Sequence, residues 1–377
     1  MGTVWLNNAA TAFPRPPEVI EAVHRALVEP PVEPGRSTGG ADPTVPCRRR
    51  LAELLGVDDP CRVALLPSAT HALNTVLAGL LDAGGHVVAS TLEHNAVLRP
   101  LAHRVRDRGL RVSWVEPGDD GRIDAVDFAA LLRPQTRLAV LLHASNVTGA
   151  VQPVEAVAAR CAEAGVPLLV DASQSAGCIP LEHRRLPGRV FLVAAGHKGL
   201  LGPPGVGVLV LPNDRLPQWM VGGTGVRSEA QFHPPELPLR HEAGTPNLPA
   251  VAGLAAGVAW VAAEGVETLG RRRAAAVRFL REALAAVPGV RTVPAQDADG
   301  RAGILSFVVD GRPPEEFAFL LRSAFGIELR AGLHCAPGAH RRLGTLPLGT
   351  LRVGVGPFTT REDLEALVDA VAQAVQV

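Results

Sequence analysis

The central part of the chain alternates short apolar runs with stretches of helical periodicity, and this alternation limits the folds that the chain can adopt. Seven short runs are candidate strands, and several of them are continuous in Val, Leu and Ala, which is typical of strands buried on both faces of a mostly parallel sheet. The runs lie at 63–67, 86–90, 111–116, 137–144, 167–172, 189–195 and 206–211. Helical patterns lie between them at about 69–82, 94–108, 124–133 and 153–164. The alternation predicts an α/β domain with a seven-stranded, mostly parallel sheet.

The pattern of predicted strands and helices changes after about residue 245. A long Ala-rich helical stretch at about 248–287 is followed by two candidate strands, 303–309 and 351–355, and by a final helix at 360–375. This order favours a smaller α+β domain. We therefore expect a large domain over 15–245 and a small domain formed by 1–14 and 246–377. The N-terminal segment is expected to join the small domain or to cross between the two.

Composition excludes several classes of protein. The chain has 37 basic and 37 acidic residues and no net charge, which disfavours a nucleic-acid binder. No apolar run of about 18 residues is free of a charge or a Gly/Pro break, so no membrane span is expected. The first residues lack the pattern of a signal peptide. The five cysteines are odd in number and form no CxxC pair, which favours free thiols in a reducing cytoplasm.

The basic residues include a single lysine, Lys198, and all the others are arginines. Arginine can replace lysine on a solvated surface, but it cannot supply the neutral amine that attacks a carbonyl, because guanidinium stays protonated. Lys198 is therefore a candidate Schiff-base residue. The competing explanation is that one lysine was retained by chance.

Four polar residues follow two neighbouring predicted strands. Asp171 ends one strand and Gln174 follows it, while His197 and Lys198 come directly after the next. Ligands of open α/β sheets bind at the carboxyl ends of the strands, so these side chains should point into one crevice. A lysine with an acid that pairs a pyridinium nitrogen is what pyridoxal phosphate chemistry requires. Taken alone, Asp171 would more often be a helix cap or an ion-pair partner.

Three further strand ends carry candidate residues. The segment at 67–71 opens a predicted helix, and its backbone N–H groups together with Thr70 could bind a phosphate, although an ordinary N-cap is the simpler interpretation. His94 could stack on an aromatic cofactor and move protons, or it could be a capping or packing histidine. Asn146 could bond a ring oxygen or the substrate.

The ordered motifs resemble those of a known family. The motifs are EHN, SNVTGAVQP, VDASQ, AGHKGLLGPPGVG, EAGTPN and RAGLHCAP. In this order and at these distances, they are similar to those of class-V aminotransferases, within fold type I of the pyridoxal phosphate enzymes. The greatest similarity is to cysteine desulfurases and selenocysteine lyases of the SufS-like group. The resemblance covers nearly the whole chain, from Asn7 to Arg352.

The resemblance implies roles for individual residues. Lys198 would bind the cofactor covalently, and His94 would stack on its ring and assist proton transfer. Asp171 would pair the pyridinium N–H and Gln174 the ring oxygen. The remaining roles concern the phosphate, the substrate and the partner subunit. The phosphate would be held by Ala69 (through its N–H), Thr70, His197 and, from the other subunit of a homodimer, Thr245; the substrate carboxylate would be clamped by Arg352, with Asn146 and Arg330 beside the substrate.

Cys335 decides the subclass. A desulfurase needs a thiolate that takes sulfur from the substrate as a persulfide and leaves alanine, and cationic neighbours favour a thiolate. Arg330 and His334 are close in sequence and could supply that charge, although Arg330 could instead only fix the loop. The short loop resembles the SufS-like group and implies a protein that accepts the persulfide. The alternatives are a small buried hydrophobe and, with His334 and His340, a metal site, for which two histidines and one cysteine are thin support.

Two residues depart from the family pattern. Ala195 stands where these enzymes usually carry a serine that bonds the phosphate, so one phosphate contact should be missing or supplied otherwise. His71 replaces the glutamate that usually follows the phosphate-binding threonine. Neither change touches Lys198 or Cys335.

The sequence predicts a pyridoxal phosphate-dependent cysteine desulfurase and leaves alternatives open. A C–S lyase, selenocysteine lyase, epimerase or aminotransferase of the same fold would not need Cys335. A cofactor-binding regulator or partner subunit is disfavoured by the intact set of Lys198, Asp171, His94 and Arg352. A nicotinamide oxidoreductase is disfavoured because no G-x-G-x-x-G follows the first strand. Cysteine and selenocysteine fit the predicted pocket equally.

Overall fold

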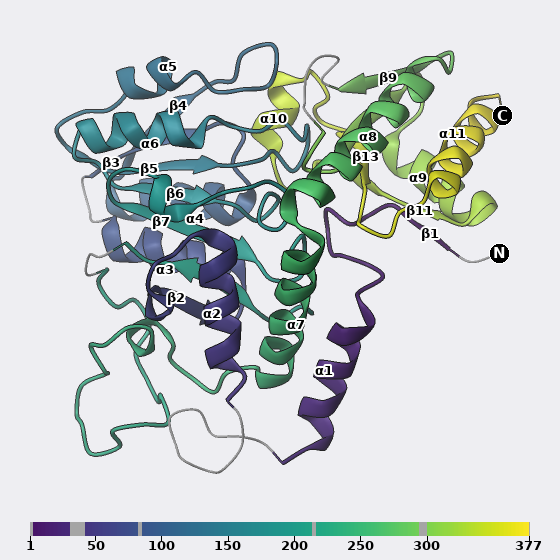
Figure 1. Cartoon of the computed structure of the whole chain (residues 1–377). Coiled ribbons are helices and arrows are strands. Elements are labelled where there is room, and N and C mark those ends of the chain that lie inside the picture. Colours follow the sequence, from purple (N-terminus) through teal and green to yellow (C-terminus); the bar gives the residue numbers. More distant parts are fainter. Residues whose placement is uncertain (1–2, 31–41, 82–84, 213–215, 294–299, 377) are drawn as a thin grey trace.

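The structure is a computed structural model that describes residues 3–30, 42–81, 85–212, 216–293 and 300–376. Figure 1 shows a large sheet flanked by helices and, beside it, a smaller group of strands and helices formed by the C-terminal part of the chain. From β2 to β6 the strands alternate with α-helices, β7 and β8 follow, and the chain becomes more helical afterwards. This order agrees with the change in sequence pattern near residue 245, while the exact domain boundaries stay a prediction.

All seven predicted strands form one sheet. Their order is β2-β8-β7-β6-β5-β3-β4, with parallel pairing from β7 through β4 and antiparallel pairing of β8 with both its neighbours. The mostly parallel seven-stranded sheet is therefore confirmed. The strands are β2 (Val63–Leu66), β3 (His86–Ser90), β4 (Arg111–Val115), β5 (Thr136–Leu142), β6 (Leu168–Asp171), β7 (Val190–Ala195) and β8 (Gly207–Val210).

The sheet is buried because helices cover both of its faces. Residues of β6 and β7 alternate between the two hydrophobic cores, so Val170 and Leu192 pack on one side while Leu169 and Phe191 pack on the other. This explains why the strands are continuous apolar runs. One face is covered by α2 (Thr44–Leu55), α5 (Ala125–Ala130), α6 (Val154–Glu163) and α7 (Leu248–Glu264), and the other by α3 (Ala69–Leu80) and α4 (Asn95–Arg108).

A second sheet has its own core. Its four strands run in the order β12-β13-β10-β9, and all their pairings are antiparallel. Phe307 of β10 and Val353 of β13 lie in a hydrophobic cluster with the apolar faces of three helices. The elements are β9 (Val290–Val293), β10 (Ile304–Val309), β12 (Arg330–Gly332), β13 (Thr350–Gly354), α8 (Val266–Ala285), α9 (Pro314–Phe325) and α11 (Arg361–Val375), with α10 (Pro337–Arg342) in the connection before β13.

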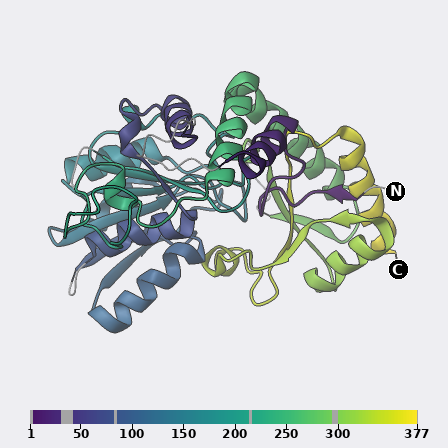
Figure 2. The same cartoon turned by 90° about the horizontal axis from the view of Figure 1, so that it is seen from below.

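The N-terminal segment joins the smaller part of the molecule and then crosses to the larger one. Its strand β1 (Val4–Trp5) pairs with β11 (Ile327–Glu328). The backbone N–H of Ala12 then donates to the carbonyl of His197, beside the single lysine, at 2.9 Å. Helix α1 (Pro17–Val28) packs along α7, and Figure 2 shows this pair between the two groups of strands. The segment therefore contacts both groups of strands, while its assignment to the small domain stays a prediction.

The long helical stretch predicted at 248–287 is two helices. Gly265, with φ +80°, separates α7 from α8, and the chain bends by 80° there. A residue with a Cβ rarely adopts this φ, so the glycine ends one helix and redirects the chain. Within the described part of the chain, no single helix is long and apolar enough to cross a membrane, and α7 with α8 pass such a test only as this bent pair.

Candidate active site

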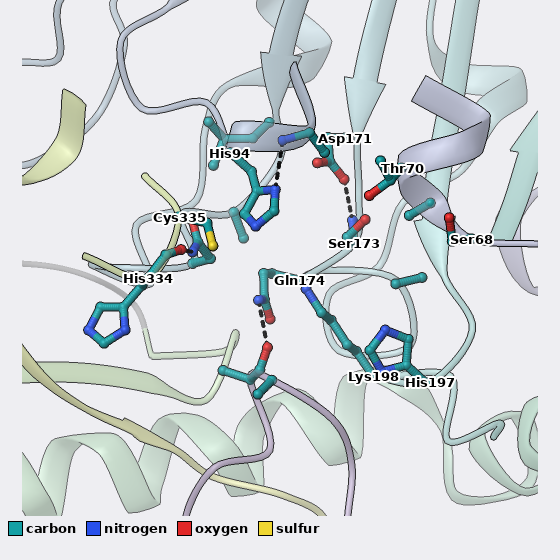
Figure 3. Close-up of a pocket in the computed structure, with 18 of the residues that line it drawn as sticks. Ser68, Thr70, His94, Asp171, Ser173, Gln174, His197, Lys198, His334 and Cys335 are labelled. Atoms are coloured by element: carbon teal, nitrogen blue, oxygen red, sulfur yellow. Dashed lines mark hydrogen bonds between the residues drawn. The ribbon is translucent and has the colours of Figure 1, made fainter. Parts of the chain in front are cut away.

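A cavity of about 250 Å³ lies where the carboxyl ends of β5, β6 and β7 face β12, β13 and the loop before α10. Figure 3 shows its polar side chains converging from these separate elements. The cavity thus brings together nearly all of the residues that the sequence singled out. Those that line it are Ala69, Thr70, His94, Asn146, Asp171, Gln174, Ala195, His197, Lys198, Arg330, His334, Cys335 and Arg352.

Lys198 lies in the turn after β7 and extends toward the centre of the cavity (Figure 3). Burial lowers the pKa of its amine to about 8, although the carboxylate of Asp171 opposes the shift. The nearby cations of Arg352 and Arg330 lower the pKa further. An appreciable fraction of the amine is therefore neutral near physiological pH, as a nucleophilic lysine requires.

Asp171 is the last residue of β6, and its side chain is buried. Its Oδ1 accepts a hydrogen bond from the backbone N–H of Ser173 at 2.9 Å. Three residues on, the amide of Gln174 donates to the carbonyl of Ala9 at 2.9 Å, which fixes it against the N-terminal segment. A buried carboxylate and an amide are thus held at the same sheet edge as the lysine.

One end of the cavity is the N-terminus of α3. Ser68 caps this helix by accepting from the backbone N–H of His71 at 3.1 Å, and Thr70 lies in the first turn. Gly207 packs against the start of the helix so closely that a Cβ would lie 2.1 Å from the Ser68 carbonyl carbon and 2.4 Å from the Ala69 nitrogen. Helix N-termini present unpaired N–H groups to anions, so this end of the cavity suits a phosphate.

His197 is oriented by the N-terminal segment. Its Nδ1 lies 3.1 Å from Oγ1 of Thr11, and the same hydroxyl accepts a hydrogen bond from Arg15. Burial lowers the pKa of His197 to about 4, and the charges of Lys198 and Arg15 add to the effect. The ring is therefore neutral at physiological pH and binds by hydrogen bonding.

His94 is the N-cap of α4. Its Nδ1 accepts a hydrogen bond from the backbone N–H of Ala96 at 3.0 Å, so the neutral ring carries its proton on Nε2. Burial, followed by the charge of Lys198, lowers the pKa of His94. Figure 3 shows the ring directed into the cavity, so the capping role and the site role predicted as alternatives coexist.

Cys335 lies opposite, in the loop between β12 and α10, and is half-buried. His334 does not provide the cation expected beside it. Burial, with the charge of Arg352, lowers the pKa of His334 to about 2, and its Nε2 lies 3.0 Å from Oγ1 of Thr350. Figure 3 shows its ring directed away from the thiol. The expectation of a charged His334 is wrong because the side chain is buried without an acid.

Arg352, from β13, is buried, and among the described residues only one of its nitrogens has a hydrogen-bond partner. Its Nη1 donates to the backbone carbonyl of Asn146 at 2.9 Å, while Nε and Nη2 are buried without a partner among the described residues. Burial, together with the charge of Arg330, lowers its pKa to about 9. Arg330 is paired directly opposite Arg352 across β12 and β13 and is exposed. An unpaired buried guanidinium is costly, and a bound anion would relieve that cost.

Three further residues that the sequence singled out are Thr245, Ala195 and His71. Thr245 lines a different cavity of about 450 Å³ and not the one around Lys198. Ala195 ends β7 and presents only a methyl group at the cavity wall. His71 packs edge-on against Trp219, with ring centroids 5.2 Å apart.

The sequence did not predict the supporting roles of several residues around the cavity. Thr11 and Arg15 orient His197, but their role depends on contacts more than 180 positions away in the sequence. Ala9 acts through its backbone carbonyl, which has no side-chain signal. Ser68, by contrast, lies in the segment for which the sequence predicted an ordinary N-cap, and the structure confirms that cap. The ring centroids of His334 and His340 lie 5.5 Å apart. For the metal site considered as an alternative, no group of three or more potential ligands occurs among the residues described.

Comparison with known proteins places this geometry in a family. The family model described as "Aminotransferase class-V" matches residues 4–367. The cysteine desulfurase CsdA of Escherichia coli is 31% identical over 99% of this chain and 94% of its own length. A probable cysteine desulfurase of Mycolicibacterium paratuberculosis is 31% identical over 98% of this chain, which spans only 55% of that relative.

Solved structures agree with the sequence comparison. A crystal structure of E. coli CsdA described as an S-sulfonic acid superposes with a TM-score of 0.88 at 28% identity, covering 99% of this chain and 95% of that one. The apo cysteine desulfurase of Thermococcus onnurineus gives a TM-score of 0.90 at 27% identity with the same coverage. The chain therefore belongs to the class-V aminotransferase family, and the relatives it resembles are named cysteine desulfurases.

Proposed function

We propose that this protein is a pyridoxal phosphate-dependent cysteine desulfurase that converts L-cysteine to L-alanine and collects the sulfur on Cys335. The main support for this proposal is that three chemical groups line the same cavity. These are the buried amine of Lys198, the buried guanidinium of Arg352, which has two nitrogens without a partner among the described residues, and the thiol of Cys335. The likeness to proteins named cysteine desulfurases supports it.

The chemistry of the donor set suits the cofactor. The N-terminus of α3 with Ala69 and Thr70, and the neutral ring of His197, would hold its phosphate, while Asp171 and Gln174 would hold the ring nitrogen and ring oxygen. The close approach of Gly207 to Ser68 keeps the first turn of α3 in place beside the sheet. When bound, pyridoxal phosphate stabilises the electron pair left on the α-carbon of an amino acid joined to it.

The chain's own groups would bind the substrate and move its protons. Arg352 would clamp the carboxylate through Nε and Nη2, with Arg330 and Asn146 nearby. The amine of Lys198, partly neutral near pH 8, would take the proton from the α-carbon. The Nε2–H of His94 would donate a hydrogen bond into the cavity, because Nδ1 is held as an acceptor.

Cys335 would take the sulfur. Its thiolate attacks the sulfur atom of the substrate, an S–S bond forms, and the bond between that sulfur and Cβ breaks. The electron pair stays on Cβ, which takes up a proton and becomes the methyl group of alanine. The two sulfurs are thereby oxidised to a persulfide while the carbon is reduced, so no external oxidant is needed.

We further propose a homodimer, a protein that accepts the persulfide, and a cytoplasmic location. Thr245 lines a cavity separate from the one around Lys198, which suits a contact with the phosphate of a partner subunit. A half-buried Cys335 would have to give its sulfur to a visiting thiol. The five free thiols suit a reducing compartment.

The test uses the purified, cofactor-loaded protein and Cys335→Ser. We expect alanine formation from cysteine to fall to background in the variant, while its cofactor absorbance and the spectral change on adding cysteine persist. Cys61→Ser, which alters an exposed thiol, is the matched control and should keep full activity. Undiminished alanine formation by Cys335→Ser would instead show that Cys335 does not collect the sulfur, whereas a C–S lyase of the same fold would release sulfide and form pyruvate in place of alanine.

A further inference from the structure

The loop that carries Cys335 has an unusual backbone. His334 and Cys335 are consecutive and have φ values of +48° and +60°. Residues with a Cβ adopt this left-handed region rarely, and two in succession persist only when the surroundings hold them. The thiol is therefore not placed by the intrinsic preference of its loop, and the contacts that hold the loop decide where the sulfur lies.

Four hydrogen bonds hold this segment. The side-chain amide of Asn146 donates to the carbonyl of His334 at 2.6 Å, and the backbone N–H of Asn95 donates to the carbonyl of Cys335 at 2.7 Å. The N–H of Ala336 closes the turn onto Leu333 at 2.9 Å. The ring of His334 is anchored to Thr350. The contact from Asn146 reaches the loop from a distant element and is a side-chain donor to its backbone.

Asn146 makes a second contact, with Arg352 of β13. Its backbone carbonyl accepts from Nη1 of Arg352 at 2.9 Å, and the residue is 6% exposed. Its own loop is fixed, because the hydroxyl of Ser145 accepts from the N–H groups of Val147 and Thr148. One buried residue on a fixed loop therefore bonds both the backbone beside the thiol and the guanidinium with two free nitrogens.

We propose that Asn146 is a positioning residue that sets the distance between Cys335 and Arg352, so that a substrate held by its carboxylate presents its sulfur to the thiol. The inference rests on the proposed function, and it assigns Asn146 to the sulfur-transfer side of the site. Asn146→Ala removes the bond to His334 but keeps the backbone carbonyl that Arg352 uses.

Two measurements test this on the cofactor-loaded protein. In Asn146→Ala, kcat for alanine should fall roughly 10–100-fold, the effect of about 1 Å of misplacement, with little change in the cysteine concentration that half-saturates the spectral change. Amide hydrogen exchange over 333–336 should become at least about threefold faster in the absence of substrate. Asn146→Asp, which keeps the shape but loses the donor, should give the same faster exchange.

A control variant and two contrary results complete the test. Asn247→Ala removes an asparagine bond at the N-cap of α7 and should leave exchange at 333–336 unchanged. A higher half-saturating cysteine concentration with unaltered loop exchange would make Asn146 a substrate-binding residue and overturn the proposal, as would no change in either measurement. Failure of the proposed function would appear separately, as a wild-type protein that forms no alanine.

Discussion

The two sides of the cavity are built in different ways. On one side, Asp171 and Lys198 follow directly from the ends of β6 and β7, so regular strands of the large sheet place them. On the other, Cys335 lies in a loop with left-handed backbone that distant residues hold. The first side is rigid by architecture, whereas the second depends on a few hydrogen bonds. We therefore expect the side with Asp171 and Lys198 (the cofactor half) and the side with Cys335 and Arg352 (the sulfur half) to tolerate changes in one another.

The largest effect is expected from Lys198→Arg, which changes the cofactor half. The substitution keeps the positive charge but removes the only lysine amine, and a guanidinium stays protonated. We expect alanine formation to fall roughly 10³-fold or more, as for other residues that act covalently, together with loss of the cofactor's absorbance in the purified protein. Retention of a covalently held cofactor, checked by borohydride reduction and mass spectrometry, would show that another amine is used.

Arg352→Gln should affect only the sulfur half. Loss of a charge-assisted carboxylate pair is worth about 1.5–3 kcal/mol, so the KM for cysteine should rise about 10–100-fold while cofactor absorbance stays normal. Because two guanidinium nitrogens are buried without partners in the described part of the chain, the variant should also unfold at a higher temperature than the wild type. A lower unfolding temperature, measured by calorimetry, would mean that Arg352 stabilises the fold.

The rate of cofactor capture by the apoprotein should depend on pH. Burial lowers the pKa of Lys198 to about 8, so below that pH the neutral fraction falls about tenfold per unit. We expect the rate of absorbance gain to rise steeply from pH 6.5 to 8 and then to level off. Lys198→Arg provides the background from the terminal amine, whose pKa is also near 8. A rate that keeps rising to pH 10 would place the pKa of Lys198 at its ordinary value.

The same contrast explains what the sequence could predict. Buried parallel strands are continuous apolar runs, so their ends, and with them Asp171 and Lys198, were located correctly. Strands of two or three residues such as β11 and β12 are too short to show a period, and they were missed. The neutral state of His334 and the bond from Asn146 to its carbonyl depend on residues brought together over long separations, which no local pattern records.

The mildest prediction concerns Ala195, at the cofactor end. Its methyl group lines the cavity beside His197, where resembling enzymes usually carry a phosphate-binding serine. Ala195→Ser should add one hydrogen bond, worth about 1 kcal/mol, and lower the cofactor's dissociation constant about fivefold by equilibrium titration. The kcat should not change, since Cys335 is held by a separate set of contacts. A faster sulfur transfer in this variant would contradict the independence of the two halves, because a contact at the phosphate would then reach the thiol.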